Sequence, residues 1–201
     1  MTEGYEDRLR KAEWEVRSVG FSEGRAFITE HHYAKGGANT CVFMHGLYRR
    51  GSDRIMGVAW WMPCLSVVGK SVNPSEYKRV LALSRLAVHP DVPKNGASFL
   101  MARSIRLVEA DRRYVSLVTY ADQFMEHTGG IYRATGWGYC GVSSVNARWE
   151  NSEGRQIATR TGNPGRTRTK AEMEALGHRL VGAYGKHKFV KHLHLDGRDL
   201  V

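Results

Sequence analysis

Two apolar segments of strand length, with one helix between them, constrain the fold of this chain more than any other feature. Val80–Val88 (VLALSRLAV) and Tyr114–Tyr120 (YVSLVTY) are nearly continuous apolar runs, which is typical of strands buried on both faces. Between them, apolar residues recur at helical spacing over 97–110. A buried strand, a helix and a second buried strand in this order predict a parallel pair in a sheet that helices cover.

The segments on either side of this unit complete the predicted fold. Strand patterns occur in four further segments, which are 14–19, 41–48, 55–61 and 137–145. Helical patterns cover 21–33, where Ser22 is the expected N-cap, and 130–134. The predicted fold class is therefore α/β (α+β), with a central mixed sheet, antiparallel first and parallel later, flanked by helices.

Length and composition suit one domain. The chain has 201 residues and 42% of them are hydrophobic, which is enough for a single core. We predict one domain over 1–201, with a basic loop at about 151–172 and a C-terminal strand at about 186–195. The loop prediction depends on glycine and proline between five cations, which are Arg155, Arg160, Arg166, Arg168 and Lys170.

Charge and cysteine content indicate the partner and the compartment. Thirty Lys and Arg against twenty Asp and Glu give a net charge of +10, which favours binding to polyanions, nucleic acid first and phosphorylated cofactors such as CoA second. The three cysteines have no CxxC spacing, so we expect a reducing cytoplasmic setting. No segment approaches the ~20 apolar residues that span a bilayer, and no signal peptide is visible, so we expect no membrane association.

A glycine-containing turn, Pro93-Lys-Asn-Gly-Ala-Ser98, joins the first buried strand to the helix. Such a turn aims backbone N–H groups and the positive end of a helix at one point, where a phosphate can bind. The alternative is an ordinary turn in which Ser98 is the N-cap.

The pair His31-His32 precedes Tyr33 at the end of a predicted helix. Adjacent residues on a helix do not share a face, so the pair does not chelate one metal ion by itself. One histidine could act as a base or a ligand from the helix end, and the alternative is a surface pair that packs on Tyr33.

Ser84-Arg85 lies inside the first buried strand, where an arginine needs a partner. The partner is either an anionic ligand or a carboxylate, for which Asp122 and Glu76 are the candidates. Asp122 follows the second buried strand, at the edge where open sheets place ligand-binding groups, although it could instead cap a turn. Tyr132, in the short helix, could donate a proton to a leaving group or could pack in the core.

The order of these pieces resembles two related families. The buried strand, glycine turn, helix, strand and GIYRATGW (130–137) resemble the core of GNAT acetyltransferases, whose turn after the fourth strand holds the CoA pyrophosphate on backbone amides. Pro93 and Ser98 depart from the Arg/Gln-x-x-Gly-x-Gly/Ala form of that turn. A narrower resemblance, over roughly residues 25–190, is to the phage Mom DNA-modification family. It rests on the ordered motifs HHY (31–33), LSRLAV (83–88), KNGAS (94–98), TYAD (119–122), HTG (127–129), IYRATGW (131–137) and KHKFV (186–190).

The Mom resemblance implies a GNAT-like fold, double-stranded DNA as the partner and a distinctive reaction. Mom proteins convert adenine in phage DNA to its N6-carbamoylmethyl (acetamido) derivative, which shields the DNA from host restriction endonucleases. The resemblance leaves the donor open between acetyl-CoA and another acyl or glycine-derived donor, with an iron-assisted step as a further alternative. The expected location is the cytoplasm of the infected bacterial host.

Under this resemblance we assign three groups of site residues. The expected catalytic residues are Asp122, Tyr132, Ser84, His31 and His32. The residues expected to hold the donor are Arg85, Lys94, Asn95, Gly96, Ala97 and Ser98. The residues expected to contact DNA or stack on a flipped base are Tyr33, Trp60, Tyr120 and His127, with Trp61 and Trp137 as further candidates, together with the cations Arg155, Arg160, Arg166, Arg168 and Lys170.

Two other functions are consistent with the same residues. One is a GNAT N-acyltransferase that acts on a small amine or on a protein, and the other is a non-catalytic DNA-binding protein. The basic loop favours the DNA modifier over the first, because a small-molecule enzyme does not need such a loop. The polar groups around Asp122 favour it over the second, because a binding module need not bury them.

Overall fold

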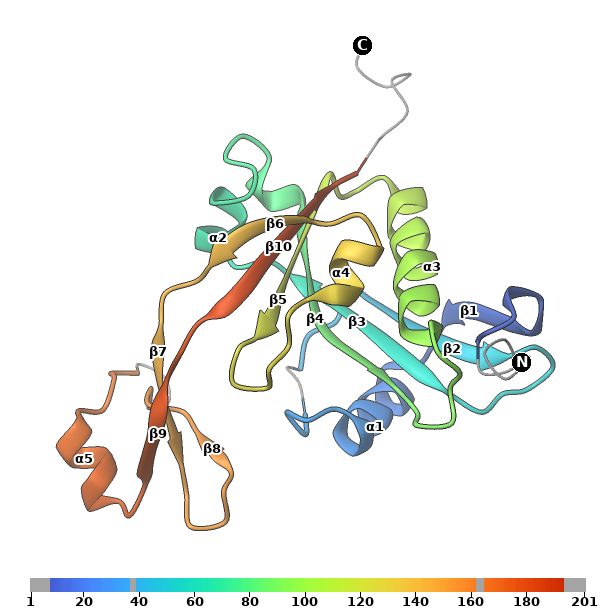
Figure 1. The fold of residues 1–201 in the computed structure, drawn as a ribbon. Helices are drawn as coiled ribbons and strands as arrows, with labels where there is room; N and C mark the ends of the chain where they lie inside the picture. The colour runs from blue at the N-terminus through green and yellow to red at the C-terminus, as the bar shows by residue number, and fades with distance from the viewer. Residues whose placement is uncertain (1–7, 37–38, 162–164, 194–201) are drawn as a thin grey trace, which may run out of the picture. The chain divides into compact units, whose positions relative to one another are not determined.

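The computed structural model describes residues 8–36, 39–161 and 165–193. Within these ranges the larger sheet has seven strands in the order β1-β2-β3-β4-β5-β10-β6 (Figure 1). The strands are β1 (Trp14–Ser18), β2 (Phe43–Arg49), β3 (Gly57–Pro63), β4 (Val80–Val88), β5 (Ser116–Asp122), β6 (Gly138–Val142) and β10 (Lys186–His192). Strands β1 to β4 pair antiparallel and β4 pairs parallel with β5, so the predicted mixed sheet is confirmed.

The two long helices, α1 (Phe21–His31) and α3 (Gly96–Asp111), cover opposite faces of this sheet (Figure 1). Gly24 of α1 approaches Met44 of β2 so closely that an added Cβ would lie 2.0 Å from the methionine sulfur. Ser104 of α3 instead hydrogen bonds to His45, the next residue of β2, at 2.7 Å. Successive side chains of a strand point to opposite faces, so the two helices lie on different sides.

The N-terminus of α1 differs from the prediction. Gly20 occupies the N-cap position in an extended conformation, and Ser22 lies inside the first turn, so the expected cap at Ser22 is wrong. The helix also ends at His31, before the predicted end at residue 33.

Two adjacent tryptophans of β3 fill the core on both sides of the sheet. Trp60 belongs to the apolar cluster under α1, with Phe27 and Met44 among its members. Trp61 faces the other way, because its indole N–H donates to Ser104 of α3 at 2.7 Å. Both side chains are fully buried, and burial of such a side chain contributes on the order of 3 kcal/mol.

Strands β4 and β5 stay paired for only a short distance. The parallel register joins Val80–Ala82 to Ser116–Val118, whereas β4 continues to Val88 and β5 to Asp122. The two strands therefore separate toward their C-terminal ends (Figure 1). Thr119, the first residue after the paired part of β5, donates its hydroxyl proton to the Leu83 carbonyl at 3.2 Å.

The chain forms two compact units. The core unit comprises 1–119, 129–140 and 189–201, and the small-sheet unit comprises 120–128 and 141–188. Within its described residues the small-sheet unit has a three-stranded sheet in the order β8-β7-β9. Its elements are β7 (Asn146–Glu150), β8 (Gln156–Ile157), α5 (Lys170–Ala175) and β9 (Arg179–Tyr184). The segment expected to be a basic loop thus contains a strand and the start of a helix.

The remaining elements are short. They are η1 (Lys11–Glu13), α2 (Ser66–Lys70), η2 (Tyr77–Arg79) and α4 (Gly130–Ala134), of which α4 was predicted with the same bounds. None of the helices in the described part of the chain is long and apolar enough to cross a membrane.

Candidate active site

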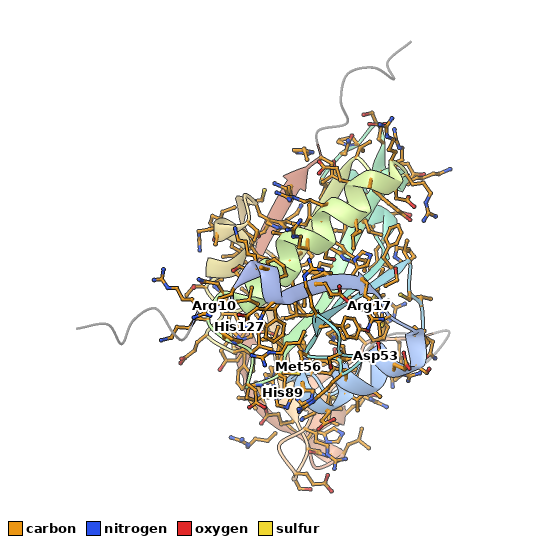
Figure 2. The ribbon with its side chains drawn as sticks, turned by 90° about the vertical axis from the view of Figure 1, so that its right-hand side faces the viewer. Arg10, Arg17, Asp53, Met56, His89 and His127 are labelled. Atoms are coloured by element: carbon orange, nitrogen blue, oxygen red, sulfur yellow. The ribbon has the colours of Figure 1, made fainter. Side chains whose placement is uncertain are left out.

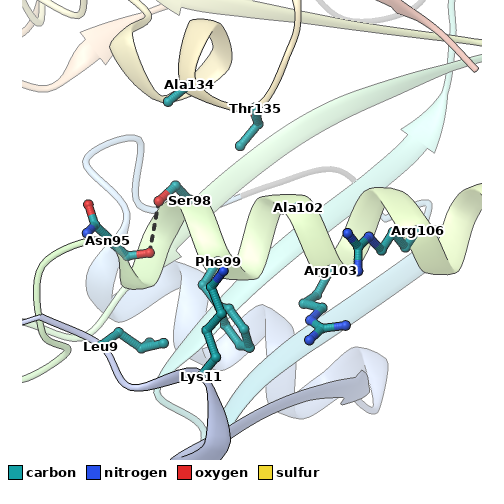
Figure 3. A pocket seen from close by; sticks show the side chains of 10 residues that line it. All are labelled: Leu9, Lys11, Asn95, Ser98, Phe99, Ala102, Arg103, Arg106, Ala134 and Thr135. Atoms are coloured by element: carbon teal, nitrogen blue, oxygen red, sulfur yellow. Dashed lines mark hydrogen bonds between the residues drawn. The ribbon is translucent and has the colours of Figure 1, made fainter.

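A cavity of about 290 Å³ lies beside α3 in the core unit (Figure 3). It is formed by α3 and its N-cap, the segment that precedes β1, and the end of α4. Its lining residues are Leu9, Lys11, Asn95, Ser98, Phe99, Ala102, Arg103, Arg106, Ala134 and Thr135. This volume is at the small end for ligand sites, so the cavity suits part of a large cofactor better than the whole.

The charge of the cavity favours an anion. Lys11, Arg103 and Arg106 line it, and its described lining contains no carboxylate. Arg103 and Arg106 are three residues apart on α3, so their side chains lie on the same face of the helix (Figure 3). Guanidinium groups form strong, often bidentate hydrogen bonds with phosphate, so the phosphorylated part of a cofactor is the chemistry that fits.

The predicted glycine turn forms one end of the cavity. Asn95 adopts a left-handed conformation with φ of 70°, and α3 begins at the next residue. A Cβ at Gly96 would lie 2.0 Å from Val92, so the turn requires glycine there. Ser98 is not the N-cap, because that position belongs to Asn95 and the serine hydroxyl donates to the Asn95 carbonyl at 2.9 Å.

Asn95 and Ser98 are the two residues of the predicted donor-binding set that line the cavity. Lys94 is exposed, and its carbonyl accepts a hydrogen bond from the Leu9 N–H at 3.0 Å, while Gly96 is buried and Ala97 half-buried. The N-terminal segment is thereby held against the turn, and it places Lys11 at the cavity (Figure 3). Sequence reasoning missed Lys11, Arg103 and Arg106, although the i, i+3 spacing of the two arginines on a predicted helix was a usable signal.

Tyr132 of α4 lies in a ring cluster of the core unit. Its ring is 5.1 Å from that of Phe189 and 5.8 Å from that of Trp137, measured between centroids. Gly129 makes this packing feasible, because a Cβ there would lie 2.2 Å from the Phe189 ring. Burial raises the pKa of the Tyr132 phenol, and a side-chain hydrogen bond with Thr119 opposes this rise. The phenol is thus protonated at neutral pH and can serve as a proton donor.

Trp137 presents an unsatisfied donor in the same cluster. Its indole N–H is buried and has no hydrogen-bond acceptor within the described parts of the chain. Its ring lies parallel to that of Trp61, at 6.5 Å between centroids. Leaving such a group unpaired costs about 1–3 kcal/mol, so the N–H is a candidate contact for a bound molecule.

Burial removes three aromatic side chains from the set expected to stack on a flipped base. Trp60 and Trp61 have no exposed surface and Trp137 has 4%, so each lies in the core instead. The sequence alone does not separate a core tryptophan from a stacking one. Tyr33 is 43% exposed and keeps an accessible ring.

Arg85 has partners other than those expected. Its Nε donates to the Gly36 carbonyl at 2.9 Å, and its Nη1 donates to the carbonyl of Ser84 at 2.7 Å and to the Ser84 hydroxyl at 3.3 Å. Of the two predicted partners, Glu76 pairs with Arg79 at 2.6 Å. The salt-bridge alternative is therefore wrong, because Arg85 instead connects β4 to the segment that follows α1. Its contact with an anionic ligand stays a prediction.

The two predicted histidines have different surroundings, as expected for adjacent residues at a helix end. The ring of His31 lies 5.1 Å from that of His89. The backbone N–H of His89 donates to the Met56 carbonyl at 2.8 Å, and these two residues lie next to each other in Figure 2. The ring of His32 is buried and stacks on Tyr33 at 4.4 Å. His31 thus lies beside the residue that follows β4, where the separated part of the strand ends.

In the small-sheet unit, Asp122 organises the turn after β5. Its Oδ1 accepts the Phe124 N–H at 3.0 Å, its carbonyl accepts the His127 N–H at 3.1 Å, and its Oδ2 lies 3.9 Å from Lys186 Nζ. The carboxylate is mostly buried, whereas Tyr120 is half-buried and His127 is exposed. The capping role is therefore present, and the predicted role toward the adenine amine stays a prediction.

An Asp122→Asn variant separates these two roles. The amide keeps an oxygen that can accept the Phe124 N–H but loses the negative charge, so the turn should persist while proton acceptance fails. We expect adenine modification to fall by roughly 10²-fold or more, with little change in melting temperature. Nucleoside analysis of co-expressed plasmid and thermal unfolding give the two readouts. Full activity in the variant removes Asp122 from the mechanism.

Three of the five cations of the predicted basic segment form ion pairs with nearby acids. Arg155 lies 3.1 Å from Glu153, Arg166 forms an ion pair with Glu172, and Lys170 lies 3.7 Å from Glu174. Arg168 approaches the Ala158 carbonyl at 3.5 Å, and Arg160 forms an isolated bridge with Thr167. Nine Lys and Arg face six Asp and Glu in this unit, so most of the net charge of +10 belongs to the core unit.

The described residues contain no group of three or more His, Cys, Asp or Glu side chains arranged to hold a metal ion. The three cysteines are free thiols.

The separated β4 and β5, the glycine turn into α3 and the short helix α4 characterise the fold. Structures of N-acetyltransferases share this fold at low sequence identity. The ribosomal-protein-S18-alanine N-acetyltransferase of Escherichia coli has a TM-score of 0.53 at 12% identity, over 94% of this chain and 99% of that one. NAA60 of Arabidopsis thaliana, in complex with a bisubstrate analogue, has a TM-score of 0.55 at 9% identity, over 90% and 98%. The structure of yncA from Salmonella typhimurium with its cofactor acetyl-CoA has a TM-score of 0.50 at 14% identity, over 90% of this chain and 94% of that one.

The fold is therefore that of the GNAT acetyltransferases, as predicted. Within this class the sequence model of the Mom protein family matches residues 13–194, and the chain belongs to that family. No curated protein sequence matches the chain.

Proposed function

We propose that this protein is a transferase that converts adenine in DNA to N6-carbamoylmethyl adenine and thereby protects phage DNA from restriction. The observation that carries the proposal is membership of the Mom family over 13–194, on a GNAT fold. A cation-lined cavity and the buried phenol of Tyr132 support a transfer reaction, since Ala134 and Thr135 of the cavity lie within one helical turn of that tyrosine.

A DNA substrate is consistent with the positive net charge of the protein. The reaction also requires access to the adenine base. A net charge of +10 favours association with the phosphate backbone. The exocyclic amine of adenine lies inside the duplex, so the base must be flipped out before it can react. Tyr33, with its exposed ring at the end of α1, is the side chain that we propose to stack on the flipped base.

The donor site is the cavity beside α3. Lys11, Arg103 and Arg106 would hold the phosphates of a donor such as acetyl-CoA, and Asn95 and Ser98 would border it at the turn. Such a cofactor supplies an activated acyl group when bound, and transfer of that group would form an N–C(=O) bond. The carbamoylmethyl group is instead joined to the adenine nitrogen through its CH2 carbon and carries an amide nitrogen. Acetyl transfer alone therefore does not form this product, and we include glycine-derived groups among the donors.

We assign the proton-transfer steps to side chains of the protein. The lone pair of the adenine amine is delocalised into the ring, so the amine reacts only if a proton is removed as the new N–C bond forms. We assign that step to Asp122, with His31 or His32 as alternatives. Tyr132 holds a proton in a buried environment and would give it to the leaving group.

Restriction digestion tests the proposal in cells. Plasmid recovered from bacteria that express the protein should resist endonucleases whose sites contain adenine. Plasmid from cells that express the Tyr132→Phe variant should be cut normally. Complete digestion of plasmid from cells with soluble wild-type protein contradicts the proposal. Acetylation of a small amine or a protein by the same preparation then identifies an ordinary N-acyltransferase.

The donor site makes a separate prediction. Replacing both Arg103 and Arg106 by glutamine should weaken binding of acetyl-CoA by roughly 10²- to 10⁴-fold, because each of the two charge-assisted contacts to phosphate contributes about 1.5–3 kcal/mol. Isothermal titration calorimetry measures the affinity. Arg25→Gln is the matched control, since Arg25 is an exposed arginine of α1 on the opposite face of the sheet. Equal affinities in all three proteins place the donor elsewhere.

A further inference from the structure

We propose that Arg148 is a positioning residue that holds the turn after β5, and with it the carboxylate of Asp122, through the ring of Phe124. The inference rests on the role of proton acceptor proposed for Asp122. All of the residues concerned belong to the small-sheet unit, which comprises 120–128 and 141–188. Arg148 lies on β7, so the three-stranded sheet acts on the reaction through this contact.

The orientation of the Asp122 carboxylate depends on the backbone of Phe124. Its Oδ1 accepts the Phe124 N–H at 3.0 Å, and its Oδ2 lies 3.9 Å from Lys186 Nζ. The first contact is a hydrogen bond and fixes the direction of the oxygen, whereas a separation of 3.9 Å is too long to impose a direction. A movement of Phe124 therefore turns the carboxylate.

The turn itself needs support from its surroundings. Glu126 has a φ of 56°, in the left-handed region that glycine adopts far more readily than glutamate. Two backbone hydrogen bonds close the turn, from the Glu126 N–H to the Gln123 carbonyl at 3.0 Å and from the His127 N–H to the Asp122 carbonyl at 3.1 Å. A strained conformation of this kind persists only where the packing around it holds it in place.

Arg148 and Tyr184 supply packing of this kind around Phe124. The guanidinium carbon of Arg148 lies 3.6 Å from the centroid of the Phe124 ring, so the cation covers one face of the ring. Tyr184 of β9 contacts the same ring edge to face, at 5.1 Å between centroids. Phe124 is thereby held by two strands of the small sheet.

Two further contacts fix the guanidinium over the ring. Its Nε donates to Glu150 Oε1 at 3.0 Å, and its Nη1 donates to Gln156 Oε1 at 3.2 Å. The side chains of Arg148 and Glu150 are only 14% and 11% exposed, so salt screens this ion pair weakly. A planar guanidinium can lie on a ring and bond to oxygen atoms at its edge at the same time, which a lysine ammonium cannot do.

Gln123 gives the turn a second anchor that does not involve Arg148. Its backbone N–H donates to the Gly185 carbonyl at 3.4 Å, and its Oε1 accepts the Gly185 N–H at 3.0 Å. The turn therefore stays attached to the segment before β10 when Arg148 is replaced. The replacement releases the Phe124 ring, and the effect on Asp122 can be measured in a folded protein.

Hydrogen exchange measured by NMR reports on the turn directly and needs no substrate. In an Arg148→Gln protein, the amides of Phe124 and His127 should exchange about 5- to 30-fold faster than in the wild type, the range for loss of a largely desolvated cation–π contact. Amides elsewhere in β7 and β9 should keep their wild-type rates. Arg179→Gln is the matched control, because Arg179 lies 3.7 Å from the same Glu150 and its side chain is 76% exposed.

Modification of co-expressed plasmid gives the second readout. Arg148→Gln should slow adenine modification by roughly 10- to 100-fold, because a small displacement of a catalytic group is costly. Affinity for a fluorescent DNA duplex, measured by anisotropy, should not change, and Arg179→Gln should match the wild type in both measurements. Phe124→Leu breaks the same contact from the other side, should behave like Arg148→Gln, and replaces it if that variant does not fold.

The outcomes separate this inference from the proposed function. Wild-type exchange at Phe124 and His127 in a folded Arg148→Gln or Phe124→Leu protein overturns the positioning role. Equal acceleration throughout β7 and β9 also overturns it, since Arg148 then stabilises the sheet as a whole. Faster exchange at the turn with an unchanged modification rate overturns it as well, because the reaction then does not depend on the position of Asp122. If the wild type modifies no DNA, the proposed function fails, and the exchange comparison still decides whether Arg148 holds the turn.

Discussion

Replacing Tyr132 by phenylalanine is expected to lower the rate of adenine modification by roughly 10²–10⁴-fold, the range that a general acid contributes. The substitution removes the phenol hydroxyl and keeps the ring that packs on Phe189 and Trp137. Stability should therefore change little. The rate is measured from the amount of modified nucleoside that forms with time in co-expressed plasmid.

Tyr139→Phe provides the matched control. Tyr139 packs on the same residue, Phe189, at 5.4 Å between centroids, but its side chain is 47% exposed. The same chemical change there should leave the rate near wild type. Full activity of the Tyr132→Phe protein, with the modified base still formed, would show that the phenol takes no part in the reaction.

Acid is expected to destabilise the core unit through His45. Its side chain is 3% exposed, and burial lowers its pKa to about 4. Its Nδ1 lies 2.7 Å from the Ser104 hydroxyl, whose oxygen also accepts the Trp61 indole N–H at 2.7 Å. Ser104 can donate its own proton to neutral His45, so protonation of the ring disrupts a buried network.

The direction of the pH effect on stability follows from the pKa of His45 in the folded and in the unfolded chain. The unfolded chain binds a proton at His45 near pH 6.5, whereas the folded chain resists it down to about pH 4. The contribution of neutral His45 is therefore complete above about pH 6.5 and is lost as the pH falls from there to about 4. The total loss is about 3 kcal/mol of unfolding free energy.

Urea unfolding at several pH values between 7 and 4 measures this loss. A His45→Gln variant should lose less stability over the same range, whatever its stability at pH 7, because its side chain does not titrate. Equal pH dependence in the two proteins would assign the acid sensitivity to other groups.

The central part of the fold could be predicted because burial on both faces leaves a strong pattern. The apolar run Val80–Val88 contains β4 as the structure has it, and helical spacing over 97–110 falls within α3. The small-sheet unit left weaker signals, since β8 is two residues long. One sequence signal for this unit was missed. Thr169 and Glu172 have the spacing of a capping box, and they form one at the start of α5.

Only part of the candidate site could be selected from the sequence, namely residues of a distinctive type that lie next to a predicted strand or helix. The glycine turn and Tyr132 have distinctive residues next to predicted elements. Arg103 and Arg106 resemble an ordinary solvated helix face until the N-terminal segment is known to pair with Lys94. That pairing joins residues far apart in the sequence, so no local pattern indicates it. The tryptophans of β3 were misassigned because stacking and core packing favour the same residue type.

The most direct test of the proposed function is the mass of the nucleosides in DNA from cells that express this protein. Plasmid from cells that express the wild type is digested to nucleosides, with the Tyr132→Phe protein as the control. We predict a deoxyadenosine species heavier by one carbamoylmethyl group in place of one hydrogen, present with the wild type and nearly absent with the variant. Only unmodified nucleosides, from cells that contain soluble folded wild-type protein, would contradict the proposed function.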